Sequence, residues 1–197
     1  MNALADRDKL FTDLHVAALK YQGFKKKGHW VTRELGELTH SFYLRASRFG
    51  NKEDAPFWID VQVFSKRWHE LVYPERPYRG PSEGPSLLSV QLGSFCEPPE
   101  HTHNITASTD VASMAVSLIT ATERHALPLL ARVQTPEALL EHHITVKEQP
   151  PYLAIVGLCR LLGREQQAIE YMQAAKRNAV HENELRFLKL REKNIWR

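Results

Sequence analysis

Residues 8–64 read DKLFTDLHVAALKYQGFKKKGHWVTRELGELTHSFYLRASRFGNKEDAPFWIDVQVF, and this stretch determines most of the predicted fold. It starts with apolar side chains at the spacing of one face of an α-helix. These side chains are Leu10, Phe11, Leu14, Ala17, Ala18 and Tyr21. Asp6 and Asp8 are candidate N-caps, and Gly23 is the kind of residue that ends a helix in a left-handed conformation. We therefore predict an amphipathic helix that ends before Gly23.

After Gly23 the sequence shows the alternating polarity, rich in aromatic and β-branched residues, that is typical of strands. The predicted strands are 30–34, 39–49, 57–64 and, further along the chain, 87–92. Gly36 and Gly50 mark turns between the first three. The lysine run 25–27 is interpreted as a solvated turn, because cations are favourable near the C-terminus of a helix.

The second half of the chain is predicted to be helical, with proline or capping residues at the starts of the segments and glycine or proline at several ends. The segments are 108–127, a short helix from 135, 151–162, 165–176 and 182–193. Ser108 or Thr109 can cap the first segment and Pro128 ends or bends it, Thr135 caps the second, and Gly163 ends the third. Residues 65–73 could extend the third strand or begin a loop. Because strands and helices occur in separate runs, the sequence predicts an α+β fold with an antiparallel sheet of about four strands. We expect residues 1–107 to form the helix and sheet. Residues 108–197 then form a helical part that packs on the same core as a single domain.

Four short motifs resemble a known family. They are Gly23 to Gly28 (GFKKKG), His29 to Glu34 (HWVTRE), Phe57 to Val63 (FWIDVQV) and Leu158 to Ala168 (LCRLLGREQQA). In this order they are similar to a family of bacterial domains of unknown function. Some members of that family resemble proteins encoded in bacterial toxin neighbourhoods. The resemblance therefore implies an immunity-type role, with a cognate toxin as the partner.

The composition is that of an ordinary folded protein. The chain has 197 residues, of which 43% are hydrophobic and 25% charged, and a formal net charge of +3. It contains no run near the roughly 20 apolar residues of a membrane span, and its N-terminus lacks the pattern of a signal peptide. Two cysteines do not make a disulfide framework. We expect a cytoplasmic protein without a membrane partner.

The predicted sheet has one clearly apolar face and one mixed face. Phe57, Ile59, Val61 and Val63 alternate onto the apolar face, where we expect the first helix to pack through Leu10, Phe11, Leu14 and Ala18. The mixed face and the proline-rich loop 74–85 supply the candidate partner-binding residues. These are Tyr43, Arg45, Trp58, Asp60, Gln62, Phe64, Tyr78 and Arg79. Aromatic residues and arginine are enriched at protein interfaces. A cover of C-terminal helices, which would make the mixed face part of the core, is an equally open interpretation.

Two other functions stay as alternatives. Cys96, or His101 with His103, could serve a Cys- or metal-dependent hydrolase, but no spacing selects a complete ligand set or a nucleophile motif. The lysine run 25–27 could bind nucleic acid, although a single short basic run is weak evidence. We favour a non-enzymatic binding protein with no cofactor, no bound metal and no catalytic residue.

Overall fold

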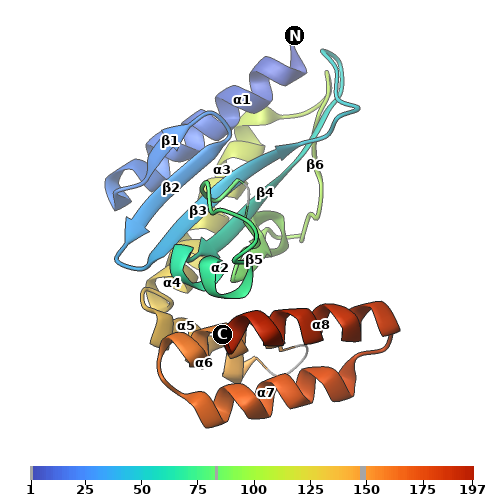
Figure 1. Cartoon of the computed structure of the whole chain (residues 1–197). Helices are drawn as coiled ribbons and strands as arrows, with labels where there is room; N and C mark the ends of the chain where they lie inside the picture. The colour runs from blue at the N-terminus through green and yellow to red at the C-terminus, as the bar shows by residue number, and fades with distance from the viewer. Residues whose placement is uncertain (1, 83, 147–149) are drawn as a thin grey trace. The chain divides into compact units, whose positions relative to one another are not determined.

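The computed structural model describes residues 2–82, 84–146 and 150–197, and it has the predicted α+β fold. The chain divides into two compact units. The first contains Met1–Glu34, Thr39–Val63 and Leu88–Ala131, and the second contains Leu35–Leu38, Phe64–Leu87 and Arg132–Arg197. Nearly all of the sheet belongs to the first unit, apart from the strand-end residues Leu35, Leu38 and Phe64, and most of the C-terminal helices belong to the second (Figure 1). The boundary predicted at 107/108 stays a prediction.

The described residues form a sheet of six strands rather than about four. The strands are β1 (Lys25–Lys27), β2 (Trp30–Leu35), β3 (Leu38–Ala46), β4 (Ala55–Phe64), β5 (Leu88–Gln91) and β6 (His103–Ile105). The first five follow one another across the sheet, and β6 pairs with the other end of β4. The pairings of β1 with β2 and of β4 with β5 and β6 are antiparallel. The lysine run is an edge strand, so its interpretation as a turn was wrong. Gly28, at φ 58°, turns the chain between β1 and β2.

Helix α1 (Ala3–Leu14) starts earlier than the sequence predicted. Its N-cap is Asn2, whose side-chain oxygen accepts a hydrogen bond from the backbone N–H of Ala5 at 3.4 Å. Asp6 therefore lies in the first turn, where a negative charge is favourable, instead of capping the helix. The candidate caps Asp6 and Asp8 were wrong because an asparagine further upstream satisfies the first free N–H groups.

A π-helical turn at His15–Leu19 changes which side chains of this helix are buried. Such a turn adds about one residue to the helical repeat, so the apolar stripe shifts along the sequence. As a result Leu19 is fully buried, Ala17 is exposed and Tyr21 is 85% exposed. Gly23 ends the helix at φ 82° in the left-handed conformation, as predicted.

The helices α1 and α3 (Val111–Ala121) contact each other and lie on the same face of the sheet (Figure 1). The eight side chains predicted to meet there, Leu10, Phe11, Leu14, Ala18, Phe57, Ile59, Val61 and Val63, are all buried. Asp110 caps α3 instead of the predicted Ser108 or Thr109. Pro128 does not end this helical run. A π-helical turn at Thr122–Ala126 precedes it, and α4 (Leu127–Arg132) continues past the proline.

The second unit contains helix α2 and the helices that come after α4 in the chain. They are α2 (Lys66–Val72), α5 (Pro136–Thr145), α6 (Tyr152–Leu161), α7 (Glu165–Asn178) and α8 (Glu182–Ile195). Residues 66–72 form neither the strand extension nor the loop that the sequence pattern allows. They form a helix because the Ser65 hydroxyl accepts the backbone N–H of Trp68 and caps it. Of the loop 74–85, residue 83 lies outside the described residues. None of the described helices has the length and apolar character that crossing a bilayer requires.

A buried histidine gives the second unit a defined pH dependence. His143 on α5 is only 4% exposed, its Nε2 has no hydrogen-bond partner in the structure, and its ring lies 5.8 Å from that of His142. Burial, with the neighbouring His142, lowers the pKa of His143 from 6.5 to about 4. The folded chain thus keeps this ring neutral in a pH range where the unfolded chain protonates it.

We expect the free energy of unfolding to fall as the pH decreases from about 6.5 to 4, because only the unfolded state takes up this proton there. The contribution of His143 is about 3 kcal/mol over that window. Urea unfolding of the parent and of His143→Leu at pH 8 and pH 4 measures it. The difference at pH 8 reports packing alone, and the variant should be relatively more stable at pH 4. An equal difference at both pH values would contradict the prediction.

Candidate functional site

The two faces of the sheet differ in burial. On the face under α1 and α3, the side chains Val31, Phe42, Leu44, Phe57 and Val61 are fully buried. The other face, here called the open face, carries half-buried or exposed side chains. Its central residues are Trp30, Tyr43, Arg45, Trp58, Asp60 and Gln62, of which only Asp60 is buried. Strand alternation produces this split, since successive side chains point to opposite faces.

The aromatic side chains of the open face are held in place by ring stacking and by neighbouring polar side chains. The rings of Trp30 and Tyr43 stack across neighbouring strands with centroids 4.2 Å apart and planes 13° apart. The Arg45 guanidinium lies 5.1 Å from the ring of Trp58, whose indole N–H donates to the Thr102 hydroxyl at 3.0 Å. These contacts order large amphipathic side chains before any partner arrives, which lowers the entropy cost of binding.

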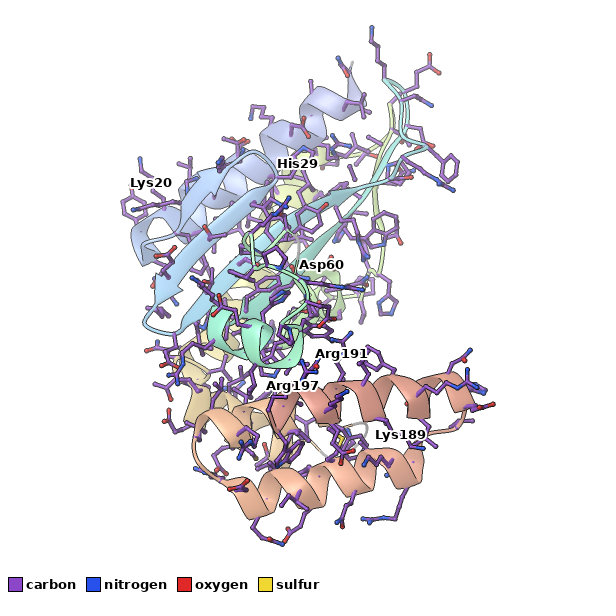
Figure 2. The ribbon with its side chains drawn as sticks, in the orientation of Figure 1. Lys20, His29, Asp60, Lys189, Arg191 and Arg197 are labelled. Carbon is purple, nitrogen blue, oxygen red and sulfur yellow. The ribbon has the colours of Figure 1, made fainter. Side chains whose placement is uncertain are left out.

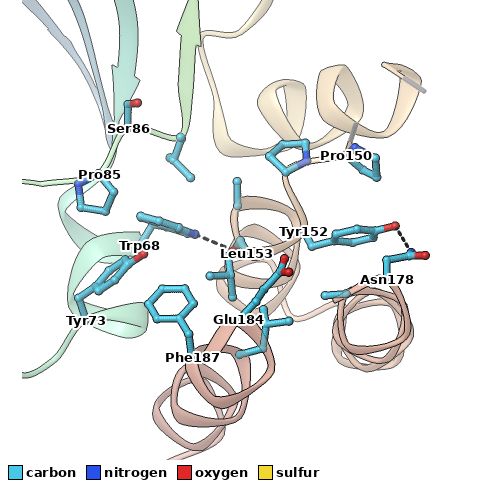
Figure 3. Close-up of a pocket in the computed structure, with 15 residues that line it drawn as sticks. Trp68, Tyr73, Pro85, Ser86, Pro150, Tyr152, Leu153, Asn178, Glu184 and Phe187 are labelled. Atoms are coloured by element: carbon cyan, nitrogen blue, oxygen red, sulfur yellow. Dashed lines mark hydrogen bonds between the residues drawn. The ribbon is translucent and has the colours of Figure 1, made fainter. Parts of the chain in front are cut away.

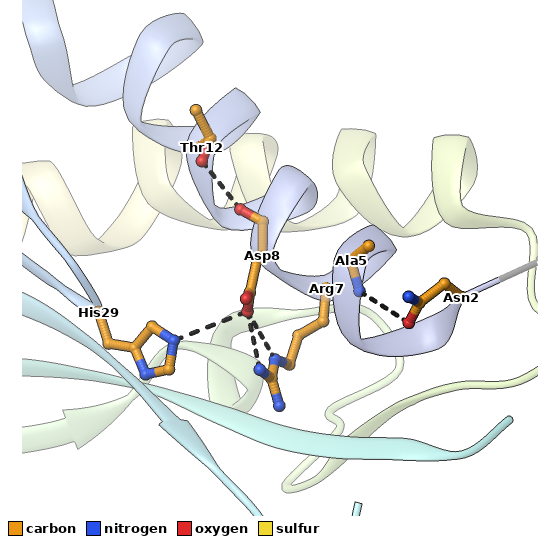
Figure 4. A network of polar contacts seen from close by, with 6 residues as sticks. All are labelled: Asn2, Ala5, Arg7, Asp8, Thr12 and His29. Atoms are coloured by element: carbon orange, nitrogen blue, oxygen red, sulfur yellow. Dashed lines mark hydrogen bonds and ion pairs between the residues drawn. The ribbon is translucent and has the colours of Figure 1, made fainter. Parts of the chain in front are cut away.

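Helix α1 supports the hairpin that carries Trp30. The Asp8 carboxylate accepts two hydrogen bonds from the neighbouring Arg7, at 2.9 and 2.8 Å, and lies 3.7 Å from Nε2 of His29 (Figure 4). His29 immediately precedes Trp30 in the turn between β1 and β2. This network connects the first helix to the turn beside the stacked ring pair.

Asp60 is the buried charge of the open face (Figure 2). Its carboxylate oxygens lie 3.4 Å from Nε and Nη2 of Arg45, which is longer than a good charge-assisted hydrogen bond. Burial raises the pKa of the Asp60 carboxyl, and the Arg45 guanidinium opposes that effect only in part. The ionised carboxylate is therefore a net cost to the folded state at neutral pH.

We expect Asp60→Asn to leave the free energy of unfolding at pH 7 within about 1 kcal/mol of the parent, because it removes a buried charge while keeping an acceptor for Arg45. The parent should also become relatively more stable as the pH falls through the raised pKa of Asp60. The folded state binds that proton more tightly there than the unfolded state does. Urea unfolding between pH 7 and pH 4 checks both points. A loss above about 2 kcal/mol at pH 7 would show that the ion pair is stabilising.

The open face continues beyond the residues predicted from the sequence. A shallow hollow of about 490 Å³ lies at the end of β3, lined by Arg45, Ala46, Ser47, Arg48, Phe49 and Trp58. At the edge of the sheet that β1 forms, Lys25 pairs with Thr32 and Lys27 pairs with Trp30, so the two lysines share the face of these residues. The face thus combines aromatic rings with several cations.

Trp30 and the two lysines are the members of the open face that sequence reasoning missed. The signal was present in the turn, since Gly28 is suited to the first position of a two-residue hairpin loop. Reading Lys27-Gly28-His29-Trp30 as such a hairpin pairs Lys27 with Trp30 directly.

The remaining predicted partner-binding residues have different surroundings. Gln62 is half-buried, and its amide lies 3.5 Å from the Ser89 hydroxyl. Phe64 is 1% exposed, so its ring is part of the core and is not available to a partner. Tyr78 and Arg79 belong to the loop of the second unit, where the Tyr78 ring lies 5.3 Å from that of His69.

The structure also places the three residues that the alternative hydrolase function would use, Cys96, His101 and His103. Cys96 is 5% exposed, and burial raises the pKa of its thiol, which disfavours the nucleophilic thiolate. His103 is buried beside Phe57 and its Nδ1 lies 2.8 Å from the Glu100 carboxylate, whereas His101 is exposed. Within the part of the chain that the structure describes, no group of three His, Cys, Asp or Glu side chains is arranged to hold a metal ion.

These features define a class: an α+β domain whose sheet is covered by helices on one face and carries ordered aromatic and basic side chains on the other. The family model of the domain of unknown function DUF4304 matches residues 15–132, which is more than half of the chain. The chain therefore belongs to the DUF4304 family. The matched region contains β1 to β6 and every residue of the open face. No curated protein and no solved structure matches the chain.

Proposed function

We propose that this protein is a non-enzymatic binding protein of the immunity type, which sequesters a bacterial toxin in the cytoplasm through its open face. One observation carries the proposal: the ordered set of Tyr43, Trp58 and Arg45, with Trp30 stacked beside it. Tryptophan, tyrosine and arginine are the residues that most often dominate binding energy at protein interfaces. The immunity role is inferred from the resemblance of the four sequence motifs to a family with members that resemble proteins of bacterial toxin neighbourhoods.

The charge of the face supports a particular kind of toxin surface. Lys25, Lys27, Arg45 and Arg48 line or flank the rings, while Asp60 is buried and paired with Arg45. A basic face attracts an acidic partner and repels a basic one, so electrostatic steering favours a toxin with an acidic contact surface.

Co-expression tests the function. The toxin to use is the product of the gene that neighbours the one encoding this protein, produced from an inducible promoter with and without this chain. Survival that requires the chain is the expected result. Equal killing in both cultures would refute the immunity role.

Variants in the same assay test the site. The triple change of Tyr43, Arg45 and Trp58 to alanine should abolish protection. The matched control changes Tyr21 and Arg124, an exposed aromatic residue and an exposed arginine of the same unit, to alanine. Protection that survives the triple change would leave the function standing and reject the open face as the binding surface.

One observation supports a second candidate. Lys25 and Lys27 share the face of Trp30, and rings beside cations form the stacking platforms that bind single-stranded nucleic acid. Titration of a labelled oligonucleotide at several salt concentrations tests it. Binding that weakens with salt and with Lys25→Gln plus Lys27→Gln supports this candidate, and its absence at low salt refutes it.

A further inference from the structure

The second unit contains a pocket that is separate from the open face. It has a volume of about 490 Å³, within the range of small-molecule sites. Helices α2, α6, α7 and α8 and the segment before β5 supply its lining. Most of its lining residues come after residue 132, outside the region that matches the DUF4304 family.

The floor of the pocket is apolar and rigid. Trp68, Leu87 and Leu188 are buried there, and the Trp68 indole N–H donates to the Leu153 carbonyl at 3.3 Å (Figure 3). The close approach of α2 to α6 at Gly157 fixes the position of the Trp68 ring. The indole N–H is thus already used, and the ring face is what this residue offers to a ligand.

The rim of the pocket carries hydrogen-bond acceptors and a negative charge. Asn178 donates its amide N–H to the Tyr152 hydroxyl at 2.7 Å, which leaves the amide oxygen of Asn178 as an acceptor. Glu184 is the only formally charged side chain among the described residues that line the pocket. One of its oxygens accepts the backbone N–H of Val180 at 3.1 Å, and Figure 3 shows the carboxylate between Trp68 and Tyr152.

Glu184 is exposed in the first turn of α8, where the helix N-terminus favours its negative charge, and it differs from the nearby Arg191 in its ion pairing. Arg191 lies 4.3 Å from the Tyr73 ring and 4.9 Å from the Phe187 ring, and it pairs with Glu75 at 2.5 Å. Glu184, in contrast, has no ion-pair partner among the described residues. An apolar, aromatic cavity with one unpaired carboxylate is complementary to an organic cation.

We propose that this pocket binds a small organic cation, an ammonium group carried on an aromatic body. The body packs against Trp68, Tyr152 and Phe187, and the ammonium group donates to Glu184 and to the Asn178 amide oxygen. This goes beyond the proposed function, because it concerns another unit of the chain and another class of ligand.

Three related probes test whether the ligand must carry a positive charge. They are tryptamine, which is protonated at neutral pH and is here called tryptammonium, the neutral N-acetyltryptamine and the anionic indole-3-propionate. Each is titrated into the full-length ¹⁵N-labelled chain, and the indole N–H signal of Trp68, assigned with Trp68→Phe, reports binding. We expect tryptammonium to bind at least about tenfold more tightly than the other two. No shift of this signal with any probe at millimolar concentration, or equal affinity for all three, overturns the proposal.

Two variants of α8 locate the charge. Glu184→Gln should bring the three affinities to within about threefold of one another. Glu182→Gln is the matched control, because Glu182 is exposed, pairs with Arg186 and does not line the pocket. The Glu182→Gln variant should keep the tenfold preference for tryptammonium over the other two probes. A preference that survives Glu184→Gln rejects the assigned ligand contact. A blocked tryptophan–lysine dipeptide that binds more tightly than tryptammonium would overturn the assignment to a small molecule and indicate a peptide instead.

Discussion

Replacing Gly157 by alanine is expected to destabilise the second unit by about 3 kcal/mol, although alanine in an unobstructed helix is more stable than glycine by about 1 kcal/mol. A Cβ at this position of α6 would lie 2.5 Å from Cδ1 of Trp68 and closer still to its Nε1, and 3.1 Å from Cγ2 of Val72. These atoms belong to buried side chains of α2, so they cannot move aside without loss of packing.

A double-mutant cycle separates this collision from other effects. In the background of Trp68→Leu, which removes the obstructing ring, Gly157→Ala should cost less than about 1 kcal/mol, because the helix-propensity gain then offsets the remaining contact with Val72. Urea unfolding of the four chains gives the coupling energy. An equal cost in both backgrounds would contradict the predicted contact between α6 and Trp68.

Arg191→Ala is expected to cost about 3 kcal/mol. The Arg191 side chain is 4% exposed, and its guanidinium donates to the Val72 carbonyl at 3.0 Å while it lies over the rings of Tyr73 and Phe187. The substitution leaves the Val72 carbonyl without this donor, removes both ring contacts and opens a cavity between α8 and α2.

Arg186→Ala is the matched control on the same helix. Its ion pair with Glu182 is exposed on both sides, at 72% and 76%, and such pairs contribute at most about 0.5 kcal/mol. Arg191→Lys should recover only part of the loss, since an ammonium group lacks the planar fork that stacks on the rings. If the two alanine variants have the same stability by urea unfolding, Arg191 does not hold α8 in place.

Much of the fold could be predicted, because hydrophobic periodicity indicates the helices and strands and because capping residues and glycines mark where helices begin and end. Gly23 and Gly163 both have positive φ and follow the helices that they were predicted to end. The cap at Thr135 and the helix that starts at Pro136 are also as predicted. These signals are local, so a single sequence displays them.

The errors arose where a tertiary feature overrides local pattern. The π-helical turn at 15–19 exposes Tyr21. The spacing of apolar residues in the sequence does not predict the extra residue that such a turn adds to the helical repeat. The lysine run forms a strand because its backbone pairs with that of β2, although lysine itself does not favour strands.

Part of the candidate site could be predicted from the sequence. Alternation along β4 placed Trp58, Asp60 and Gln62 on one face, but periodicity alone could not decide whether helices cover that face. It also could not show that Phe64, with the same alternation, is buried. The open face became complete only with the register that brings Lys25, Lys27 and Trp30 to the same side.

Binding of the partner through the open face is tested most directly by calorimetric titration of the purified toxin. Trp58→Ala should weaken binding by about 2 kcal/mol or more, a factor of roughly 30, because the ring lies at the centre of the ordered set. Tyr21→Ala, which removes a ring that is 85% exposed elsewhere on the same unit, should leave the dissociation constant unchanged. Equal affinity of the parent and Trp58→Ala, with both chains folded by circular dichroism, would contradict the account.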